Sequence, residues 1–252
     1  MRVIKIGGRV QGDRALPLAL VAAWRSAPGT IVVVHGGGDE VSALQRQLGS
    51  APRFVGGRRV TTAADLEVVR MVLSGTVNKR LVAQLQGASA VGLSGEDAGL
   101  LEANVVDPAL GRVGRPLRVN PGVLTALLGA LFLPVVSPLA REAGIAAGTA
   151  LNVNGDDAAA AIAAALRAEE LLLLADVAGV LDGGVPVRAL DPDGARALIA
   201  RGIAVGGMAA KLEAACVAIA RGVSRVRIGG LSAIGDRDAG TCVSLEPVPA
   251  EP

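Results

Sequence analysis

"TIVVVHGGGDEVSALQRQLG", residues 30–49, is the stretch that decides the fold class. It opens with a nearly continuous apolar run at 30–34, continues with three glycines at 36–38, and ends in a helical pattern of apolar positions. A strand that is apolar on both sides is typical of a sheet whose two faces are covered. A glycine turn between a strand and a helix is typical of the ligand-binding edge of an open α/β sheet. We therefore predict a strand, a glycine loop and a helix beside a binding crevice.

Strand and helix patterns alternate along the rest of the chain. Short runs with strand character stand at 2–6, 88–94 and 170–177, and helical patterns occur at 14–26 and from 155 onward. Strands separated by helices imply a mostly parallel sheet. With 252 residues the chain could form one large domain or two lobes, and its length alone does not decide between them.

Some segments depart from this alternation. Residues 62–86 form a long helical pattern in which Ser74 and Gly75 predict a break or bend. The apolar face of this segment could contact the core or a second subunit, and we favour the core. Glycines, prolines and short β patterns predict three hairpins, at 99–120, at 144–153 and at 179–190.

Composition excludes several classes of protein. Hydrophobic residues make up 51% of the chain and aromatic residues only 1%, so few side chains could stack on nucleic-acid bases. The 25 basic and 23 acidic residues leave a net charge of +2 and form no basic arm, which argues against nucleic acid or a membrane as a partner. Two cysteines and one histidine are too few for a disulfide framework or a structural zinc site. The sequence shows no signal-like segment and no run of about 18 apolar residues, so we expect a cytoplasmic location.

Three glycine groups stand at the ends of predicted strands, at 5–8, 35–38 and 94–99. Glycines leave backbone N–H groups open to an anion, and the start of the next helix adds its positive dipole end. Neither the GxxxxGK[ST] loop nor the GxGxxG loop occurs, which argues against the two most familiar nucleotide sites. His35 lies between a buried strand and a glycine turn, so we interpret it as a structural histidine and not as a general base.

Lysine is rare in this chain. Only Lys5, Lys79 and Lys211 occur, and arginine supplies the remaining basic charge. Lys5 lies in the apolar first strand just before a glycine pair, and Lys211 lies one turn into a helix after another glycine pair. Lysine carries a compact point charge. We predict that Lys5 and Lys211 supply positive charge to a phosphate.

The segment "LNVNGDDAA", residues 151–159, places two asparagines and two aspartates directly before an alanine-rich helix. Asn and Asp cap helix N-termini, and Asp offsets the positive end of the helix dipole, so capping alone could account for them. The same side chains could instead hold a ligand or another side chain. The residues themselves leave both interpretations open.

Taken together, nine motifs resemble those of the amino acid kinase family in their order and approximate spacing, over essentially the whole chain. They are "KIGG", "VVVHGGG", "GRRVT", "GTVNKRLV", "VGLSGEDAG", "LNVNGDDAA", "LLLADVAGVL", "GGMAAK" and "GTCV". The resemblance implies a three-layer α-β-α sandwich with a mainly parallel central sheet, the amino acid kinase or carbamate kinase-like fold, in one domain of residues 1–252. It also implies an N-terminal lobe of about 1–168, with the amino-acid substrate and a dimer contact, and a C-terminal lobe of about 169–252, with ATP.

Within the family, the chain is most similar to the branch that phosphorylates N-acetyl-L-glutamate in arginine biosynthesis. This resemblance implies transfer of the γ-phosphoryl group of ATP to the side-chain carboxylate of that substrate. Mg²⁺ would be carried by the nucleotide and not by protein ligands. A carboxylate is already ionised at pH 7, so this nucleophile needs no general base.

The resemblance also assigns roles to individual residues. Two lysines would stabilise the transferring phosphoryl group and one aspartate would hold both of them, and these are Lys5, Lys211 and Asp156. The amino-acid substrate would contact Gly37, Gly38, Arg59 and Asn152. The nucleotide would contact Gly8, Asp176, Val177, Gly179, Val180, Leu181, Ile203, Ala204 and Val205.

Two positions depart from the family pattern: Arg58 stands where an apolar residue is usual, and Gly155 stands where alanine is more common. Neither removes a matched functional residue. In this family a helix before the first strand accompanies hexameric, arginine-inhibited forms. Because the sequence starts at its first strand, we expect a homodimer with weak or absent arginine feedback.

Two alternatives remain open from the sequence. The first is the lysine-pathway relative that phosphorylates an aminoadipate derivative on a small acidic carrier protein, although "NVNGD" and "GGRRVT" fit that branch less well. The second is a non-catalytic amino-acid or nucleotide sensor on the same fold. Retention of Lys5, Asp156 and Lys211 together argues against a sensor, because binding alone does not require all three.

Overall fold

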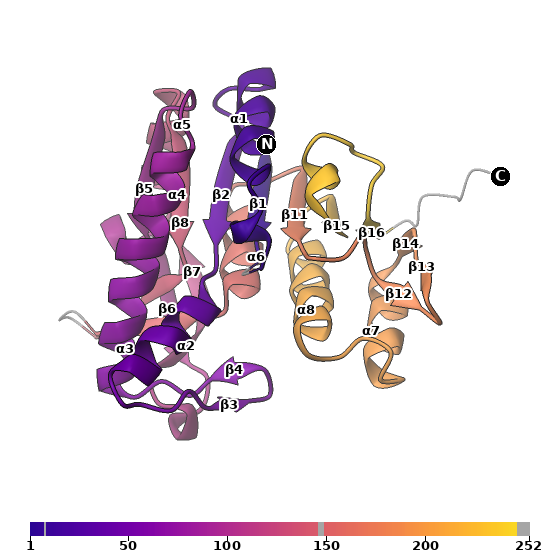
Figure 1. Cartoon of the computed structure of the whole chain (residues 1–252). Helices are drawn as coiled ribbons and strands as arrows, with labels where there is room; N and C mark the ends of the chain where they lie inside the picture. The colour runs from indigo at the N-terminus through magenta and orange to yellow at the C-terminus, as the bar shows by residue number, and fades with distance from the viewer. Residues whose placement is uncertain (8, 146–148, 246–252) are drawn as a thin grey trace.

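The computed structural model describes residues 1–7, 9–145 and 149–245 (Figure 1). The helices are α1 (Leu16–Ser26), α2 (Gly38–Gln47), α3 (Ala63–Arg70), α4 (Asn78–Gln84), α5 (Gly122–Gly129), α6 (Gly155–Ala165), α7 (Pro192–Ala200) and α8 (Gly206–Ala220). The strands are β1 (Arg2–Ile6), β2 (Ile31–His35), β3 (Phe54–Val55), β4 (Arg58–Arg59), β5 (Ala90–Ser94), β6 (Leu101–Val105), β7 (Val113–Val119), β8 (Leu133–Ser137), β9 (Leu139–Glu142), β10 (Ala150–Val153), β11 (Glu170–Leu174), β12 (Leu181–Asp182), β13 (Val185–Pro186), β14 (Ala189–Leu190), β15 (Arg225–Gly229) and β16 (Thr241–Val243).

The central sheet has eight strands in the order β14-β16-β15-β11-β1-β2-β8-β5. The six strands from β15 to β5 are parallel, and β16 runs antiparallel to β15. The predicted, mostly parallel sheet is therefore confirmed. β1 pairs with β2 on one side and with β11 on the other, so the first strand of the chain lies in the middle of the sheet.

Helices cover both faces of this sheet and complete the three-layer sandwich. α6 packs against β1, β2 and β11, whereas α4 and α5 pack against β8. In Figure 1 the chain up to α6, indigo to pink, lies at the left, and the part after β11, orange to yellow, lies at the right. None of the helices in the described ranges is long and apolar enough to cross a membrane.

The sequence analysis did not include β8 and α5. Both lie in a leucine-rich and alanine-rich stretch, 122–137, which has neither a clear helical period nor an alternating strand pattern. Short apolar runs of this kind do not distinguish a buried strand from a buried helix. β8 is nevertheless central, because it joins β2 to β5.

The helical segment 62–86 is broken where Ser74 and Gly75 predict. α3 continues into a π-helical segment, Met71–Val77, before α4 begins. The apolar side chains of Leu66, Val69 and Val72 pack in one buried cluster, as the core interpretation predicts.

The hairpin predicted at 99–120 is confirmed as β6 and β7, and the one at 179–190 as β12 and β13. The prediction at 144–153 is partly wrong. β10 lies within that range, but its antiparallel partner β9 precedes it, and residues 146–148 lie outside the described part of the chain. β6, β7, β9 and β10 together form a small closed barrel.

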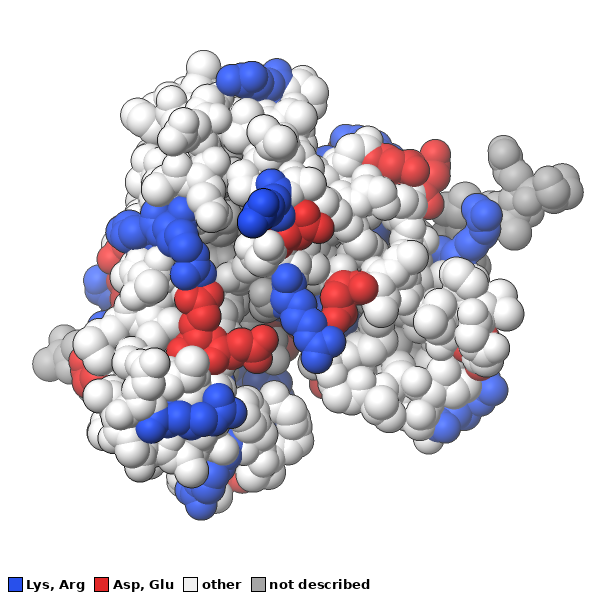
Figure 2. Space-filling model, in the orientation of Figure 1, with Lys and Arg blue, Asp and Glu red and all other residues white. Residues whose placement is uncertain are grey.

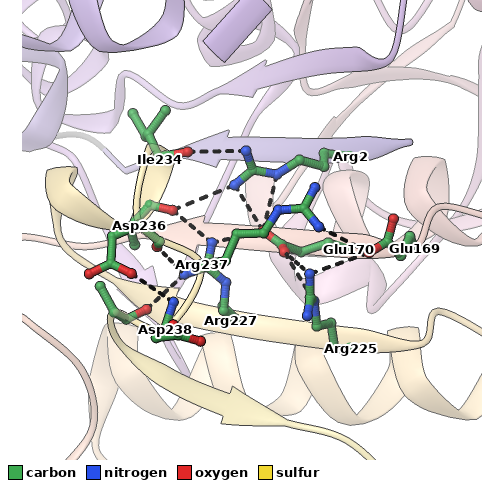
Figure 3. Close-up of polar contacts among 11 residues, drawn as sticks. Arg2, Glu169, Glu170, Arg225, Arg227, Ile234, Asp236, Arg237 and Asp238 are labelled. Atoms are coloured by element: carbon green, nitrogen blue, oxygen red, sulfur yellow. Dashed lines mark hydrogen bonds and ion pairs between the residues drawn. The ribbon is translucent and has the colours of Figure 1, made fainter. Parts of the chain in front are cut away.

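A buried network of charges joins the strands at the sheet edge where β1, β11 and β15 begin (Figure 3). Glu170 is fully buried and accepts from Arg2, Arg225 and Arg227 at 2.9, 3.1 and 2.9 Å. Burial acts to raise the pKa of Glu170, but the neighbouring guanidinium groups outweigh it and lower the pKa. The network ties the strands together at the end of the sheet where they begin. The glycine loops lie at the opposite end, where the strands finish.

Candidate active site

The glycine loops meet at the carboxyl ends of the central strands. Gly36, directly after β2, donates its backbone N–H to the carbonyl oxygen of Ile6 at the end of β1 (3.1 Å). Gly8 lies outside the described residues. Gly37 precedes α2 with a φ of 148°, a conformation that favours glycine, and an added Cβ would lie 2.8 Å from Leu73. This turn aims the start of α2 at the crevice.

Asp156 holds the two rare lysines. Lys5 Nζ lies 2.8 Å from Asp156 Oδ1, and Lys211 Nζ lies 3.1 Å from Asp156 Oδ2. The three residues come from β1, from the first turn of α6 and from the second turn of α8. Their side chains are only 9%, 6% and 12% exposed. The cluster therefore carries one net positive charge in a largely desolvated position, where an electrostatic interaction is strong.

The two lysines change the ionisation of the carboxylate. Burial acts to raise the pKa of Asp156, but the positive charges and hydrogen bonds of Lys5 and Lys211 outweigh it and hold the pKa below its usual range. For Lys211, burial lowers the pKa, and repulsion from Lys5 lowers it further against the attraction of Asp156. Asp156 is therefore a fixed anion at neutral pH.

The glycine at position 155 has a local reason. A Cβ added there would lie 3.1 Å from Lys5 Cε, a tight contact, and 3.6 Å from the carbonyl oxygen of His35. The departure from the more common alanine thus leaves room for the side chain of Lys5 beside the start of α6.

The four polar side chains of "LNVNGDDAA" have different partners. Asn154 is the N-cap of α6, since its Oδ1 accepts from the backbone N–H of Asp156 (2.8 Å) and Asp157 (3.4 Å). Asn152 donates from Nδ2 to Thr61 Oγ1 (3.1 Å). Asp156 holds the lysines, and Asp157 pairs with Arg58 (2.8 Å), a contact that the sequence analysis missed.

A cavity of about 170 Å³ lies at the start of α6, where Gly155 lines it and stands close to the side chain of Lys5. Its wall includes the predicted substrate residues Gly37, Gly38, Arg59 and Asn152 together. The structure thus brings together the four residues that the sequence assigned to one amino-acid substrate.

Arg59 is held firmly in this wall. Its Nη2 donates to the carbonyl oxygen of Gly38 (2.7 Å) and to Ser42 Oγ (2.8 Å), and its Nη1 donates to Gln45 Oε1. The guanidinium carbon also lies 4.7 Å from the centre of the Phe54 ring. Burial lowers the pKa of Arg59, but arginine remains a cation in proteins.

His35 has the structural role predicted for it. It is fully buried, its Nδ1 lies 2.8 Å from the carbonyl oxygen of Gly36, and its Nε2 lies 3.1 Å from Nδ2 of Asn78. Because the Asn78 amide nitrogen can only donate, Nε2 accepts and Nδ1 carries the proton. Burial lowers the pKa of His35 to about 4, so the ring is neutral.

The residues expected to hold a nucleotide lie after β11 and before α8. Asp176 pairs with Arg9 (2.9 Å), which joins the loop after β11 to the loop after β1. Figure 2 shows this face hollowed between the two parts of the chain, with basic and acidic side chains around the hollow.

The remaining members of the set fall into two classes. Val177, Leu181 and Val205 have exposed apolar side chains. By contrast, Val180 and Ala204 are buried, and Ile203 is partly buried against the core. Gly179 packs against Thr241. These four residues therefore support the loops from the core side.

Sequence analysis missed several polar partners in the site, namely Arg9, Ser42, Gln45, Thr61 and Asn78. Each contacts a predicted residue or His35, but none stands inside a glycine loop or beside Lys5 or Lys211. One local signal pointed to Ser42. It stands four residues after Gly38 and therefore on the same face of α2, where its hydroxyl donates to the carbonyl oxygen of Gly38 (2.9 Å). In the described ranges no group of three or more His, Cys, Asp or Glu side chains could hold a metal ion.

Comparisons with known proteins identify the family of this chain. The model of the amino acid kinase family matches residues 1–230. The acetylglutamate kinase of Methanopyrus kandleri is 47% identical over 247 residues, 93% of this chain and 96% of that protein. The acetylglutamate kinase of Cereibacter sphaeroides is 46% identical over 232 residues, 90% of this chain and 78% of that protein. The solved structure of smu.665 from Streptococcus mutans UA159 superposes with a TM-score of 0.88 at 29% identity, covering 97% of this chain and 98% of that one. This chain belongs to the amino acid kinase family.

Proposed function

We propose that this chain is an acetylglutamate kinase, which transfers the γ-phosphoryl group of ATP to the side-chain carboxylate of N-acetyl-L-glutamate in arginine biosynthesis. The observation that carries the proposal is the cluster of Lys5, Asp156 and Lys211, held at the start of α6, whose first residue Gly155 lines the same cavity as Arg59 and Asn152. Relatives of 46% and 47% identity that are named acetylglutamate kinases support it.

The reaction brings two anions together, and the cluster suits that task. The substrate carboxylate attacks without a general base, because it is ionised at neutral pH. Lys5 and Lys211 neutralise the charge on the transferring phosphoryl group, and Asp156 is a positioning residue that holds both ammonium groups. The backbone N–H groups at the start of α2 add donors to the same oxygens.

The substrate is recognised at its fixed end. Arg59 faces the α-carboxylate through the donors that its protein contacts leave over, and Asn152 faces a carboxylate or acetamido oxygen. Gly37 and Gly38 let the substrate approach their backbone.

ATP occupies the loops after β11 and before α8, with its base against Val177, Leu181 and Val205. Mg²⁺ that arrives with the nucleotide supplies additional neutralisation of phosphate charge. The division into an N-terminal lobe of about 1–168 and a C-terminal lobe of about 169–252 belongs to the same proposal, and its boundary falls between α6 and β11.

We extend the proposal to a homodimer in the cytoplasm. Met71, outside the buried cluster of the segment from α3 to α4, is 54% exposed and offers apolar surface in the N-terminal lobe. Two free cysteines, Cys216 and Cys242, suit a reducing compartment. Multi-angle light scattering tests the dimer, and a monomer or hexamer would contradict it.

A coupled ADP-release assay with N-acetylglutamate, N-acetylaminoadipate and glutamate in parallel tests the activity. We expect turnover with N-acetylglutamate at the highest kcat/KM. Preference for the aminoadipate derivative would move the chain to the lysine-pathway reaction, and no turnover with any of the three would overturn the kinase assignment.

A further inference from the structure

Arg58 reaches across the amino-acid cavity to α6. It stands in β4, and its Nη2 lies 2.8 Å from Asp157 Oδ2 in the first turn of the helix. The two side chains are 20% and 21% exposed, so the pair is largely shielded from water. Arg58 also lines the cavity that holds Arg59 and Asn152. The ion pair therefore fixes the guanidinium of Arg58 at the cavity.

One end of this guanidinium has no partner. Nη1 of Arg58 is buried and, within the described part of the chain, makes no hydrogen bond. Arginine cannot lose its proton in a protein, so both N–H bonds of Nη1 remain donors. A buried donor left unsatisfied costs free energy, and an acceptor in the cavity removes that cost. Because Arg58 is part of the cavity wall, an oxygen of a bound ligand can supply this acceptor once the guanidinium turns toward it.

Arg58 and Arg59 differ in how far the protein already uses them. Arg59 donates to Gly38, Ser42 and Gln45 and packs against an aromatic ring. Arg58 has Asp157 alone, which engages Nη2 and leaves Nη1 without a partner in the described part of the chain. Arg58 thus retains more donor capacity for a ligand than its neighbour.

We propose that Arg58 is a further substrate-binding residue, which Asp157 positions and whose Nη1 donates to an oxygen of the amino-acid substrate. This inference rests on the proposed function and adds a determinant of specificity to it. Arg58 and Arg59 are the charged residues in the cavity wall. Arg58 is paired with Asp157 and Arg59 contacts only neutral partners, so Arg59 gives the wall its net positive charge and would repel a free α-ammonium group. The pair of arginines therefore selects an acidic amino acid whose amine is acylated.

Steady-state kinetics of four variants test the proposal. Arg58→Leu removes the donor, Arg58→Lys keeps the charge without the fork, and Asp157→Asn removes the positioning charge. Arg118→Leu is the matched control, because Arg118 also pairs with a carboxylate (Glu102, 2.7 Å) from a strand, but its side chain is 74% exposed. Each variant is assayed for kcat and for the KM of N-acetylglutamate, glutamate and ATP, and its melting temperature is measured.

We expect Arg58→Leu to raise the KM for N-acetylglutamate about tenfold or more, as loss of a charge-assisted hydrogen bond does. The KM for ATP stays unchanged, and the preference for N-acetylglutamate over glutamate falls. Arg58→Lys and Asp157→Asn have smaller effects of the same sign, and Arg118→Leu has none. An unchanged acceptor KM in Arg58→Leu, with or without a lower melting temperature, reduces the pair to a structural contact and overturns the inference.

Failure of the inference and failure of the proposed function give different results. If the unmodified protein turns over N-acetylglutamate and Arg58→Leu does so with the same KM, the function stands and the role of Arg58 falls. If the unmodified protein shows no turnover, calorimetric titration of the unmodified protein and Arg58→Leu with N-acetylglutamate decides the role directly. Weaker binding to the variant supports it, and equal binding or none to either protein rejects it.

Discussion

Lys5 Nζ lies 2.8 Å from Asp156 Oδ1, and the second oxygen of the same carboxylate is taken by Lys211. One buried anion thus spaces two cations that would otherwise repel each other. This arrangement is present before the substrate binds. If the phosphoryl group passes between the two lysines, their positions need little reorganisation during the reaction. The predictions below separate this positioning from ground-state binding and from stability.

Removal of either lysine should slow the chemical step. We expect Lys211→Ala and Lys5→Ala to lower kcat about 100-fold or more, because each removes charge stabilisation that is strongest in the transition state. The KM for ATP should change by no more than about threefold. Lys79→Ala is the control, since Lys79 donates to the carbonyl oxygen of Gly92 away from the cluster. A rise in KM at constant kcat would show that the lysine only binds ground-state nucleotide.

Asp156→Asn should lose both stability and activity. The amide leaves two ammonium groups without their carboxylate, and breaking a buried ion pair costs about 3 kcal/mol. Glu170→Gln, in the network at the other edge of the sheet, should also lower the free energy of unfolding but leave kcat largely intact (Figure 3). Urea denaturation and initial rates on both variants check this. Full activity in Asp156→Asn would refute the positioning role.

On the alkaline side, kcat should begin to fall at a lower pH than it would if Lys211 had the usual pKa of a lysine. Burial and Lys5 lower the pKa of Lys211 from its usual 10.5, and only the protonated form stabilises a phosphoryl group. As pH rises through this lowered pKa, the charge and the activity are lost together. We expect the alkaline limb of kcat to lie below pH 10.5 and to move upward in Lys211→Arg, if that variant keeps activity. A limb that is unchanged in the arginine variant would assign it to another group.

Stability should decline as pH falls below about 6.5. The pKa of His35 is lowered from 6.5 to about 4, so between these values the unfolded chain binds a proton that the folded one excludes. The stabilisation is complete above pH 6.5 and is lost as pH falls toward 4. From pH 7 to 5.5 we expect a loss of about 1 kcal/mol in the free energy of unfolding. His35→Gln should lack this loss, and an equal slope in both proteins would exclude His35 as its source.

Most of the sheet could be predicted because the local sequence pattern indicates its strands. Residues 30–34 are nearly all apolar and residues 2–6 are apolar except for Arg2 and Lys5. Glycines follow both runs closely, which is typical of a buried strand at a ligand edge. β8 could not be predicted in the same way. The residues before and after it are equally apolar, so no change in the pattern shows where the strand begins and ends. The register of β9 with β10 depends on a tertiary barrel and not on a turn signal near 144.

Within the candidate site, glycine loops, rare lysines and family motifs identified residues, but not their partners. The pairs Arg58–Asp157 and Arg9–Asp176 each join two segments far apart in the sequence, and no periodicity connects such positions. Arg59 was assigned by its motif, yet its commitment to Ser42 and Gln45 appears only once β4 packs beside α2.

The cluster at Asp156 also has a consequence for the order in which the chain matures. Lys5 lies in β1 and Lys211 in α8, so the two lysines are translated 206 positions apart. A nascent chain that ends before α8 lacks Lys211 and therefore the second cation of the cluster. If this cluster performs the transfer, turnover can begin only after α8 has been made and has packed against α6, so activity reports that this contact has formed.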